Sequence, residues 1–355
     1  MAQIKLSDAD EIYERARDGA ISRDDAIYLM EHHELLFQIA DELRRNACGD
    51  IVTYVINRNI NFTNRCVGDC RFCAFRDENG YTLTMDEIIS KVEEARRFGA
   101  TEVCIQGGLA PGLRVEDYCE ILEGIKSNFP KMHIHAFSPM EIMHMSINSG
   151  VDEADALMEL RKSGLGSIPG TAAEILIDRV RRIICPSKLD SERWIKIVRA
   201  AHGLGIPTTS TMMYGHIETD EDRIDHILKI KEIQKETRGF TEFIPLPFMS
   251  KNNPLGNVCS EVSMTEHMKV HAISRVVLHG YVKNIQASWV KLGPRAAQKM
   301  LFFGANDLGG TLMEENISKS AGASHGEYMS PEAFVDLVEA AGRRPARRTT
   351  LYAIY

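Results

Sequence analysis

The sequence of 355 residues contains no apolar stretch close to the roughly 18 residues that a membrane-spanning helix needs. Residues 1–8 also lack the apolar core of a secretory signal. Basic residues are not in excess, because the formal net charge is -8 at pH 7. These absences predict a cytoplasmic protein without a membrane partner, and they give no surface that would attract a nucleic-acid backbone.

The eight cysteines include no second C-x2-C pair and no histidine pair downstream of the kind that zinc sites use. Three of them, Cys66, Cys70 and Cys73, have C-x3-C-x2-C spacing within eight residues. A [4Fe–4S] cluster normally takes four cysteines, so this loop leaves one iron for a ligand that is not protein. An amine with a carboxylate, as in S-adenosylmethionine (SAM), fits that iron. The loop therefore predicts a three-cysteine iron–sulfur site.

The other five cysteines are scattered through the chain at Cys48, Cys104, Cys119, Cys185 and Cys259. Isolated cysteines of this kind are typical of reduced thiols in a reducing compartment. A redox-labile cluster requires the same surroundings, which agrees with a cytoplasmic location.

No G-x-G-x-x-G motif follows the first predicted strand, which disfavours a doubly wound nucleotide-binding sheet. Residues 1–50 are predicted to be a helical N-terminal segment, with a helix start at Ser22. Residues 51–355 alternate strands and helices and end in a helix from Ser330 and a solvated basic tail. The strands are predicted at residues 51–56, 102–106, 133–137, 166–168, 208–214, 241–244, 283–289 and 306–311. Eight strand–helix units predict an α/β fold, a closed (βα)8 barrel of the TIM type.

The active site of such a barrel lies at the C-terminal ends of its strands. Gln106, Gly107 and Gly108 follow the second predicted strand, where the glycines would let a ligand approach the backbone. Ser138 and Glu174 are the polar groups after the third and fourth strands, and Gly215 follows the fifth. A plain turn is the alternative reading for the glycine pair.

The seventh and eighth predicted strands are unusually polar for a barrel. Asn284, Gln286 and Ser288 alternate and should therefore face one way, while Asp307 and Glu315 lie at and beyond the eighth strand. Buried polar groups without partners cost about 1 to 3 kcal/mol each. These residues are therefore predicted to bind a ligand rich in donors and acceptors, and an internal hydrogen-bond network is the alternative.

With Phe72 before its last cysteine, the loop resembles the radical-SAM superfamily signature. Four longer runs resemble the CofH family, the second subunit of FO synthase in coenzyme F420 biosynthesis, and they lie at residues 59–76, 164–176, 240–248 and 304–315. The related aminofutalosine-pathway enzymes of menaquinone synthesis share most of these runs. They tend to carry a glycine run where this chain has Thr171-Ala172-Ala173 before Glu174.

The resemblance implies a transferase that joins L-tyrosine to 5-amino-6-(D-ribitylamino)uracil. In that family a reduced cluster cleaves SAM, and the 5′-deoxyadenosyl radical takes a hydrogen from the tyrosine amine. The Cα–Cβ bond then breaks, the 4-hydroxybenzyl radical adds to the pyrimidine, and the remainder leaves as an imine of glyoxylate. The cofactors supply the difficult step, while the protein positions the partners and excludes water and oxygen.

The resemblance also implies roles for individual residues. Cys66, Cys70 and Cys73 would ligate the cluster, with Phe72 beside the adenine. Gln106, Gly107 and Gly108 stand where many relatives have Gly-Gly-Glu for the SAM amine, so the partner of that amine is open. Ser138, Glu174 and Gly215 would contact the rest of SAM. Expected substrate residues are Asn284, Gln286, Ser288, Asp307 and Glu315, with Arg76 for the tyrosine carboxylate. No catalytic side chain is assigned.

Two other functions remain open at this point. One is a menaquinone-pathway radical-SAM enzyme acting on a futalosine derivative, which only substrate tests separate from the transferase. The other is a binding or sensor module whose iron–sulfur or zinc centre is structural, which would need a distant fourth protein ligand. The expected partners of the enzyme are an external electron donor and, through the resemblance, the first FO synthase subunit (CofG).

Overall fold

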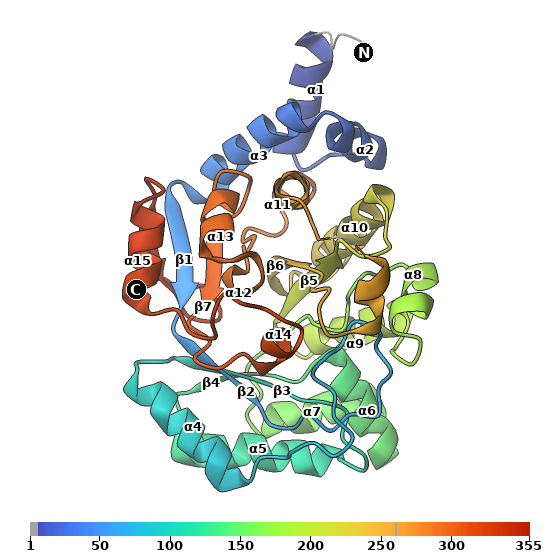
Figure 1. Ribbon diagram of the computed structural model, residues 1–355, viewed down its shortest axis with the longest axis vertical. Coiled ribbons are helices and arrows are strands. Elements are labelled where there is room, and N and C mark those ends of the chain that lie inside the picture. Colours follow the sequence, from blue (N-terminus) through green and yellow to red (C-terminus); the bar gives the residue numbers. More distant parts are fainter. Residues whose placement is uncertain (1–5, 260) are drawn as a thin grey trace.

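The computed structural model describes residues 6–259 and 261–355. The predicted N-terminal segment contains three helices, α1 (Leu6–Arg17), α2 (Arg23–Glu31) and α3 (His33–Cys48). Ser22 caps α2 by accepting a hydrogen bond from the backbone of Asp25, which confirms the predicted helix start. The three helices project at one end of the molecule, where α3 packs against α11 (Met264–Leu278) (Figure 1). Residues 1–5 of the predicted segment lie outside the described residues.

All ladders between the named strands are parallel. They form three sheets with the orders β7-β1-β8, β2-β3-β4 and β5-β6. The strands are β1 (Ile51–Val55), β2 (Asn57–Asn61), β3 (Glu102–Gln106), β4 (His133–Ala136), β5 (Thr208–Tyr214), β6 (Phe240–Pro247), β7 (Asp307–Gly310) and β8 (Arg344–Arg347). Parallel pairing with intervening helices is the α/β organisation that the sequence predicts.

Single bridges, not ladders, link the three sheets. His135 pairs with Ser167 and Ile168 with Thr208, while Phe243 pairs with Ile285 and Gln286 with Asp307. The predicted strands at residues 166–168 and 283–289 are therefore reduced to bridging residues. The regular ladders make three separate sheets and not one closed sheet, so the structure shows the α/β fold without a continuous barrel wall.

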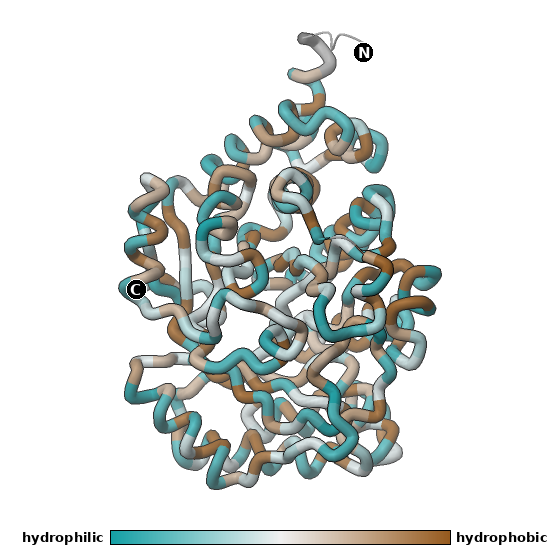
Figure 2. Tube along the Cα trace, viewed as in Figure 1, coloured by the Kyte–Doolittle hydropathy of each residue, from teal (hydrophilic) through white to brown (hydrophobic). Residues whose placement is uncertain are grey.

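Helices lie outside the strands and pack against one another, for example α4 against α5 (Figure 1). Thr84 and Glu87 form a capping box at the start of α4 (Met85–Arg97). Figure 2 shows hydrophobic and hydrophilic residues alternating along these helices, as expected for helices with one buried face. The others are α5 (Val115–Asn128), α6 (Pro139–Ser149), α7 (Glu153–Lys162), α8 (Asp178–Ile184), α9 (Ser191–Gly203), α10 (Asp220–Thr237), η1 (Pro254–Val258), α12 (Trp289–Leu292), α13 (Pro294–Met300), α14 (Asn316–Ser320) and α15 (Pro331–Glu339).

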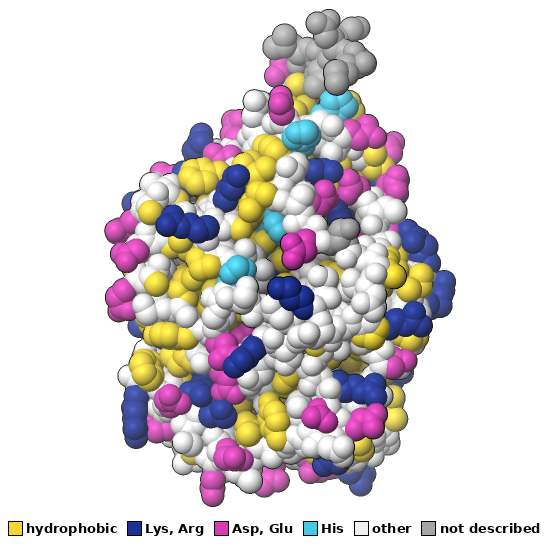
Figure 3. Space-filling model, viewed as in Figure 1, with side chains coloured by type: hydrophobic (Ala, Val, Ile, Leu, Met, Phe, Trp, Pro, Cys, Tyr) yellow, Lys and Arg dark blue, Asp and Glu magenta, His cyan; other side chains and the backbone are white. Residues whose placement is uncertain are grey.

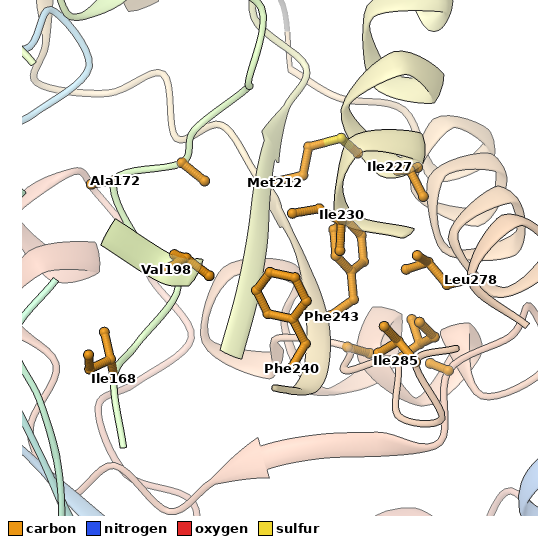
Figure 4. Close-up of a cluster of buried hydrophobic side chains, with 14 of the residues drawn as sticks. Ile168, Ala172, Val198, Met212, Ile227, Ile230, Phe240, Phe243, Leu278 and Ile285 are labelled. Carbon is orange, nitrogen blue, oxygen red and sulfur yellow. The ribbon is translucent and has the colours of Figure 1, made fainter. Parts of the chain in front are cut away.

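The largest hydrophobic core lies between the strands and this helical layer. Phe240 and Phe243 of β6 meet Ile227 and Ile230 of α10 and Leu278 of α11 (Figure 4). All of these side chains are buried. Burying one such side chain contributes about 1.5 to 3 kcal/mol, so this packing fixes the strands whose ends carry the polar groups described below.

The C-terminal segment is not the solvated tail that the sequence predicts. Arg344–Arg347 form β8, which pairs with β1 from Ile51↔Arg344 to Tyr54↔Arg347. The next residue, Arg348, is only 2% exposed and forms an ion pair with the buried Asp307. The prediction of a solvated tail was wrong, because a run of arginines does not show that one of them pairs with a buried carboxylate elsewhere in the chain.

Within the described chain, no helix is long and apolar enough to cross a membrane. On the face shown in Figure 3, Lys and Arg side chains are interspersed with Asp and Glu. This mixed distribution agrees with the absence of a basic surface expected from the net charge.

Candidate active site

A cavity of about 400 Å³ lies among the strands, and residues that follow β2, β3 and β4 line it. It brings together the three loop cysteines and most of the residues that the sequence singles out. Those lining it are Cys66, Cys70, Phe72, Cys73, Arg76, Gln106, Gly107, Gly108, Ser138, Glu174, Gln286, Ser288 and Glu315.

Three predicted site residues lie outside the lining of this cavity. Gly215 packs against Val262 and donates its backbone N–H to Glu218. Asn284 donates to the backbone oxygen of Thr241 at 3.0 Å. Asp307 is fully buried in its ion pair with Arg348.

The alternation inferred for the seventh strand does not hold, because residues 285 and 286 form isolated bridges and not a regular strand. The internal network that the sequence left open is present for Asn284 and Asp307. Gln286 and Ser288 remain on the cavity wall.

The cysteine loop is held to its surroundings through its backbone. Val67 donates to the carbonyl of Leu109, and Arg71 donates to that of Ile184 at 2.8 Å. Arg76 donates to the carbonyl of Gly68 and pairs with Glu78 at 2.8 Å. Arg76 therefore lines the cavity with its guanidinium already engaged in holding the loop.

The three thiols fit the cluster that the loop predicts. They line the same cavity, and the backbone N–H of Gly68 points to the Cys66 sulfur at 3.3 Å. Burial raises the pKa of the Cys70 thiol to about 12. Such a thiol becomes a thiolate only when a metal cation replaces its proton. Over the described residues, no three His, Cys, Asp or Glu side chains converge on a single-ion position; in a cube the cysteines bind separate irons.

Gly107 and Gly108 let the cysteine loop pack tightly against the end of β3. A Cβ on Gly107 would come within 2.5 Å of the Phe62 ring, and one on Gly108 within 2.3 Å of the Arg65 carbonyl oxygen. The close packing of the protein therefore requires glycine at both positions, whether or not a ligand binds there. Both still line the cavity, so their contact with SAM stays a prediction.

Ser138 caps α6 and forms a capping box with Glu141, a buried carboxylate that the sequence analysis did not select. Glu141 also accepts the backbone N–H of Gly107 at 3.0 Å and lines the cavity. Burial raises the pKa of Glu141 to about 7. The spacing Ser138-x-x-Glu141 is a capping-box signal that could have revealed this residue.

Glu174 pairs with Lys188 at 2.5 Å on the cavity wall, and the ammonium lies 5.2 Å from the centre of the Phe72 ring. Burial opposes the ionisation of both groups, but their opposite charges lower the pKa of Glu174 and raise that of Lys188. Lys188 was missed because it comes from a loop far along the chain from the cysteines. The pair places a carboxylate, a cation and an aromatic ring beside the cysteine loop.

Arg348 and Glu242 belong to a second group of buried charged side chains on the cavity wall. Arg348 pairs with Asp307 at 2.6 Å and approaches Glu242 at 3.6 Å, while Tyr352 donates to Glu242 at 2.6 Å. Burial raises the pKa of Glu242 to about 7. Arg348 and Glu242 line the cavity, whereas the sequence analysis selected neither.

Comparisons with known proteins identify the family and the fold. The family model described as the Radical SAM superfamily matches residues 60–230, and the model described as the CofH/MqnC C-terminal region matches residues 237–355. The structure of methylornithine synthase (PylB) superposes with a TM-score of 0.74 at 18% identity, covering 95% of this chain and 97% of that chain. The structure of the hydrogenase maturase HydG superposes with a TM-score of 0.77 at 17% sequence identity, covering 99% of this chain and 78% of that chain. The fold and the three-cysteine cavity thus define a radical SAM enzyme.

Two relatives specify the family. A protein of Methanosarcina barkeri named 5-amino-6-(D-ribitylamino)uracil--L-tyrosine 4-hydroxyphenyl transferase 1 is 57% identical over 97% of this chain and 93% of its own. A transferase of the same type from Archaeoglobus fulgidus is 58% identical over 90% of this chain and 93% of its own. The chain belongs to this transferase family.

Proposed function

We propose that this protein cleaves the Cα–Cβ bond of L-tyrosine and joins the 4-hydroxybenzyl group to 5-amino-6-(D-ribitylamino)uracil. The observation that carries the proposal is the single cavity that joins the three-cysteine loop to Gln286, Ser288 and Glu315. A polyhydroxylated chain and a pyrimidine need many hydrogen-bond partners, and this wall supplies amide, hydroxyl and carboxylate groups. The transferase relatives, 57% and 58% identical, support the same reaction.

The parallel pairings support a TIM-type barrel as the frame of this site. The order of paired segments runs from β2 through β3 and β4 to residues 167–168. It continues through β5 and β6 to residues 285–286, and then to β7 and β1. β1 continues directly into β2 along the chain. Eight strand positions in this order match a (βα)8 arrangement, with residues 1–50 as a preceding helical segment and residues 51–355 as the barrel domain.

Cys66, Cys70 and Cys73 would hold the [4Fe–4S] cluster, and SAM would occupy the fourth iron and the cavity beside it. When bound, the two supply a one-electron cleavage that yields a carbon radical. The chain's own residues bind and orient the reactants in an enclosed volume. Phe72, Gln106, Gly107, Gly108, Ser138 and Glu174 line the part of the cavity assigned to SAM.

Glu174→Gln is expected to weaken SAM binding by roughly 10- to 100-fold, since a hydrogen bond to a charged group is worth about 1.5 to 3 kcal/mol. Glu174 Oε1 accepts from Lys188, and Oε2 receives no hydrogen bond from any described residue, so a ligand ammonium or hydroxyl can donate to it. Equilibrium dialysis of the cluster-loaded protein measures this affinity. Iron content should stay unchanged, and Glu116→Gln on the surface of α5 is the control. Equal SAM affinity in the Glu174→Gln and Glu116→Gln variants would show that Glu174 does not bind SAM.

The proposed partners are L-tyrosine, the diaminouracil, an external electron donor and the first FO synthase subunit. All eight cysteines are free of disulfides. Free thiols beside a redox-labile cluster support a reducing, cytoplasmic location.

An anaerobic assay tests the reaction directly. Reduced, cluster-loaded protein is incubated with SAM and L-tyrosine, with and without the diaminouracil, and the products are followed by mass spectrometry. We expect a tyrosine-derived adduct of the pyrimidine only when both substrates are present. Turnover of a futalosine derivative without that adduct would instead establish a menaquinone-pathway enzyme.

A further inference from the structure

Lys291 lies on a short turn of helix that is fixed firmly to the cavity wall. The helix α12 follows residues 285 and 286, which bridge β6 and β7, and it lies beside these strands in Figure 1. The indole N–H of Trp289 donates to the carbonyl of Gly310 at 2.9 Å, and the backbone N–H of Lys291 donates to Ser288 at 3.2 Å. Lys291 lines the cavity together with Ser288 and Trp289.

Lys291 differs from the other Lys and Arg side chains that line this cavity. Arg76 pairs with Glu78 at 2.8 Å, Lys188 with Glu174 at 2.5 Å, and Arg348 with Asp307 at 2.6 Å. No described residue lies within ion-pair distance of the Lys291 ammonium or accepts a hydrogen bond from it. It is therefore the cavity cation that remains available to a ligand, as far as the described chain shows.

The surroundings of Lys291 favour an anionic ligand. Burial lowers the pKa of Lys291, and the charges of Glu315 and Glu174 act in the opposite direction. An ammonium removed from water without a partner is costly, and a carboxylate that binds it removes most of that cost. A carboxylate placed in this part of the cavity would hence meet a cation that already lacks a counterion.

Two ligands of the proposed reaction carry a carboxylate, namely the methionyl part of SAM and L-tyrosine. The strand neighbours of α12 are β6 and β7, whereas the cysteine loop follows β2, which pairs with β3. The residues assigned to SAM lie in the cysteine loop after β2, after β3 and β4, and, for Glu174, after residues 166–168. The helix α12 instead follows residues 285–286, on the part of the wall formed by the later strands. Arg76, the residue expected for the tyrosine carboxylate, is already engaged by Glu78 and by the carbonyl of Gly68.

We propose that Lys291 binds the carboxylate of the amino-acid substrate, L-tyrosine, and so fixes the position of its Cα–Cβ bond within the cavity. This inference rests on the proposed function. It assigns a binding role to a residue that the sequence pattern did not single out.

The role of Lys291 is tested by measuring ligand binding under conditions that prevent turnover. Dissociation constants for L-tyrosine and for tyramine, which lacks the carboxylate, are measured by calorimetry on cluster-loaded protein with SAM and no reductant. Wild-type protein should bind tyrosine roughly 10- to 100-fold more tightly than tyramine, as expected for a charged hydrogen bond. Lys291→Met should lose this preference by weakening tyrosine alone, and Lys291→Arg should keep part of it. Lys299→Met, an exposed lysine on α13, is the matched control.

The outcomes separate this inference from the proposed function. Equal affinity of the wild-type protein for tyrosine and tyramine would overturn the inference without any variant. Weaker SAM binding with unchanged tyrosine binding in Lys291→Met would also overturn it, because the methionyl carboxylate would then be the partner. An absence of the tyrosine-derived adduct in the wild-type assay would instead reject the proposed function. Iron content of each variant shows that the site is intact.

Discussion

Cys70→Ala is expected to abolish cluster assembly and all SAM cleavage. The wild-type protein should bind about four irons per chain after anaerobic reconstitution, through Cys66, Cys70 and Cys73. Two thiolates cannot replace the three that the loop supplies, and the other cysteine of the cavity lining, Cys104, lies within β3 and not in the loop. Iron and sulfide analysis together with the visible absorption spectrum measures the loss, and 5′-deoxyadenosine formation measures the consequence.

Cys119→Ala provides the matched control for this prediction. Cys119 lies half-buried on α5, and it is not part of the cavity lining. This variant should keep its full iron content and activity. Zinc in the purified wild-type protein, or an intact cluster after Cys70→Ala, would contradict the three-cysteine assignment and favour a structural metal site.

Arg348→Leu is expected to lower the free energy of unfolding by about 3 to 5 kcal/mol, the usual cost of leaving one charge of a buried pair without its partner. Asp307 is fully buried, and it accepts hydrogen bonds from Arg348 at 2.6 and 3.1 Å. Glu242 also faces Arg348, but burial raises its pKa to about 7, so it can take up a proton. The loss is large against a total stability of about 5 to 15 kcal/mol. The midpoint of anaerobic urea unfolding measures it.

A second substitution distinguishes the lost ion pair from lost packing. Combining Arg348→Leu with Asp307→Asn removes both charges, while the amide oxygen can still accept from the backbone N–H of Gly309 and the amide nitrogen can donate to the hydroxyl of Thr53. The double variant should recover part of the lost stability. Arg344→Leu, an exposed position on β8, should shift stability by no more than about 0.5 kcal/mol. An unchanged unfolding midpoint in Arg348→Leu would show that the buried pair does not stabilise the fold.

The Asp307 ion pair also changes what is expected of Asp307. The sequence pattern placed this residue on a polar face predicted to bind the substrate. In the structure its oxygens are occupied by Arg348, Thr53 and Gly309. A substitution of Asp307 should therefore act first on stability. Gln286 and Ser288 line the cavity and stay the predicted ligand-binding residues of this wall.

Local signals in the sequence determined several features correctly. Capping boxes start α2 and α4, because a side-chain oxygen satisfies a free backbone N–H within three residues. The strands predicted at residues 51–56 and 208–214 are present as β1 and β5. The three cysteines lie within eight residues, so their spacing alone indicated one site, and all three line the cavity. Each of these features depends only on residues close together in the chain.

The tertiary structure alone decided which charged groups meet. Lys188 reaches Glu174 from a separate loop, and Arg348, directly after β8, reaches Asp307 from 41 positions along the chain. The tertiary structure also decided that residues 167–168 and 285–286 form only isolated bridges. Asn284 donates to the backbone of Thr241, while Gln286 remains on the cavity wall. The same packing leaves Lys291 without an ion-pair partner among the residues that the structure describes. Burial and pairing across distant segments set the free energy of a charge, and no local pattern in a sequence records which segments fold together.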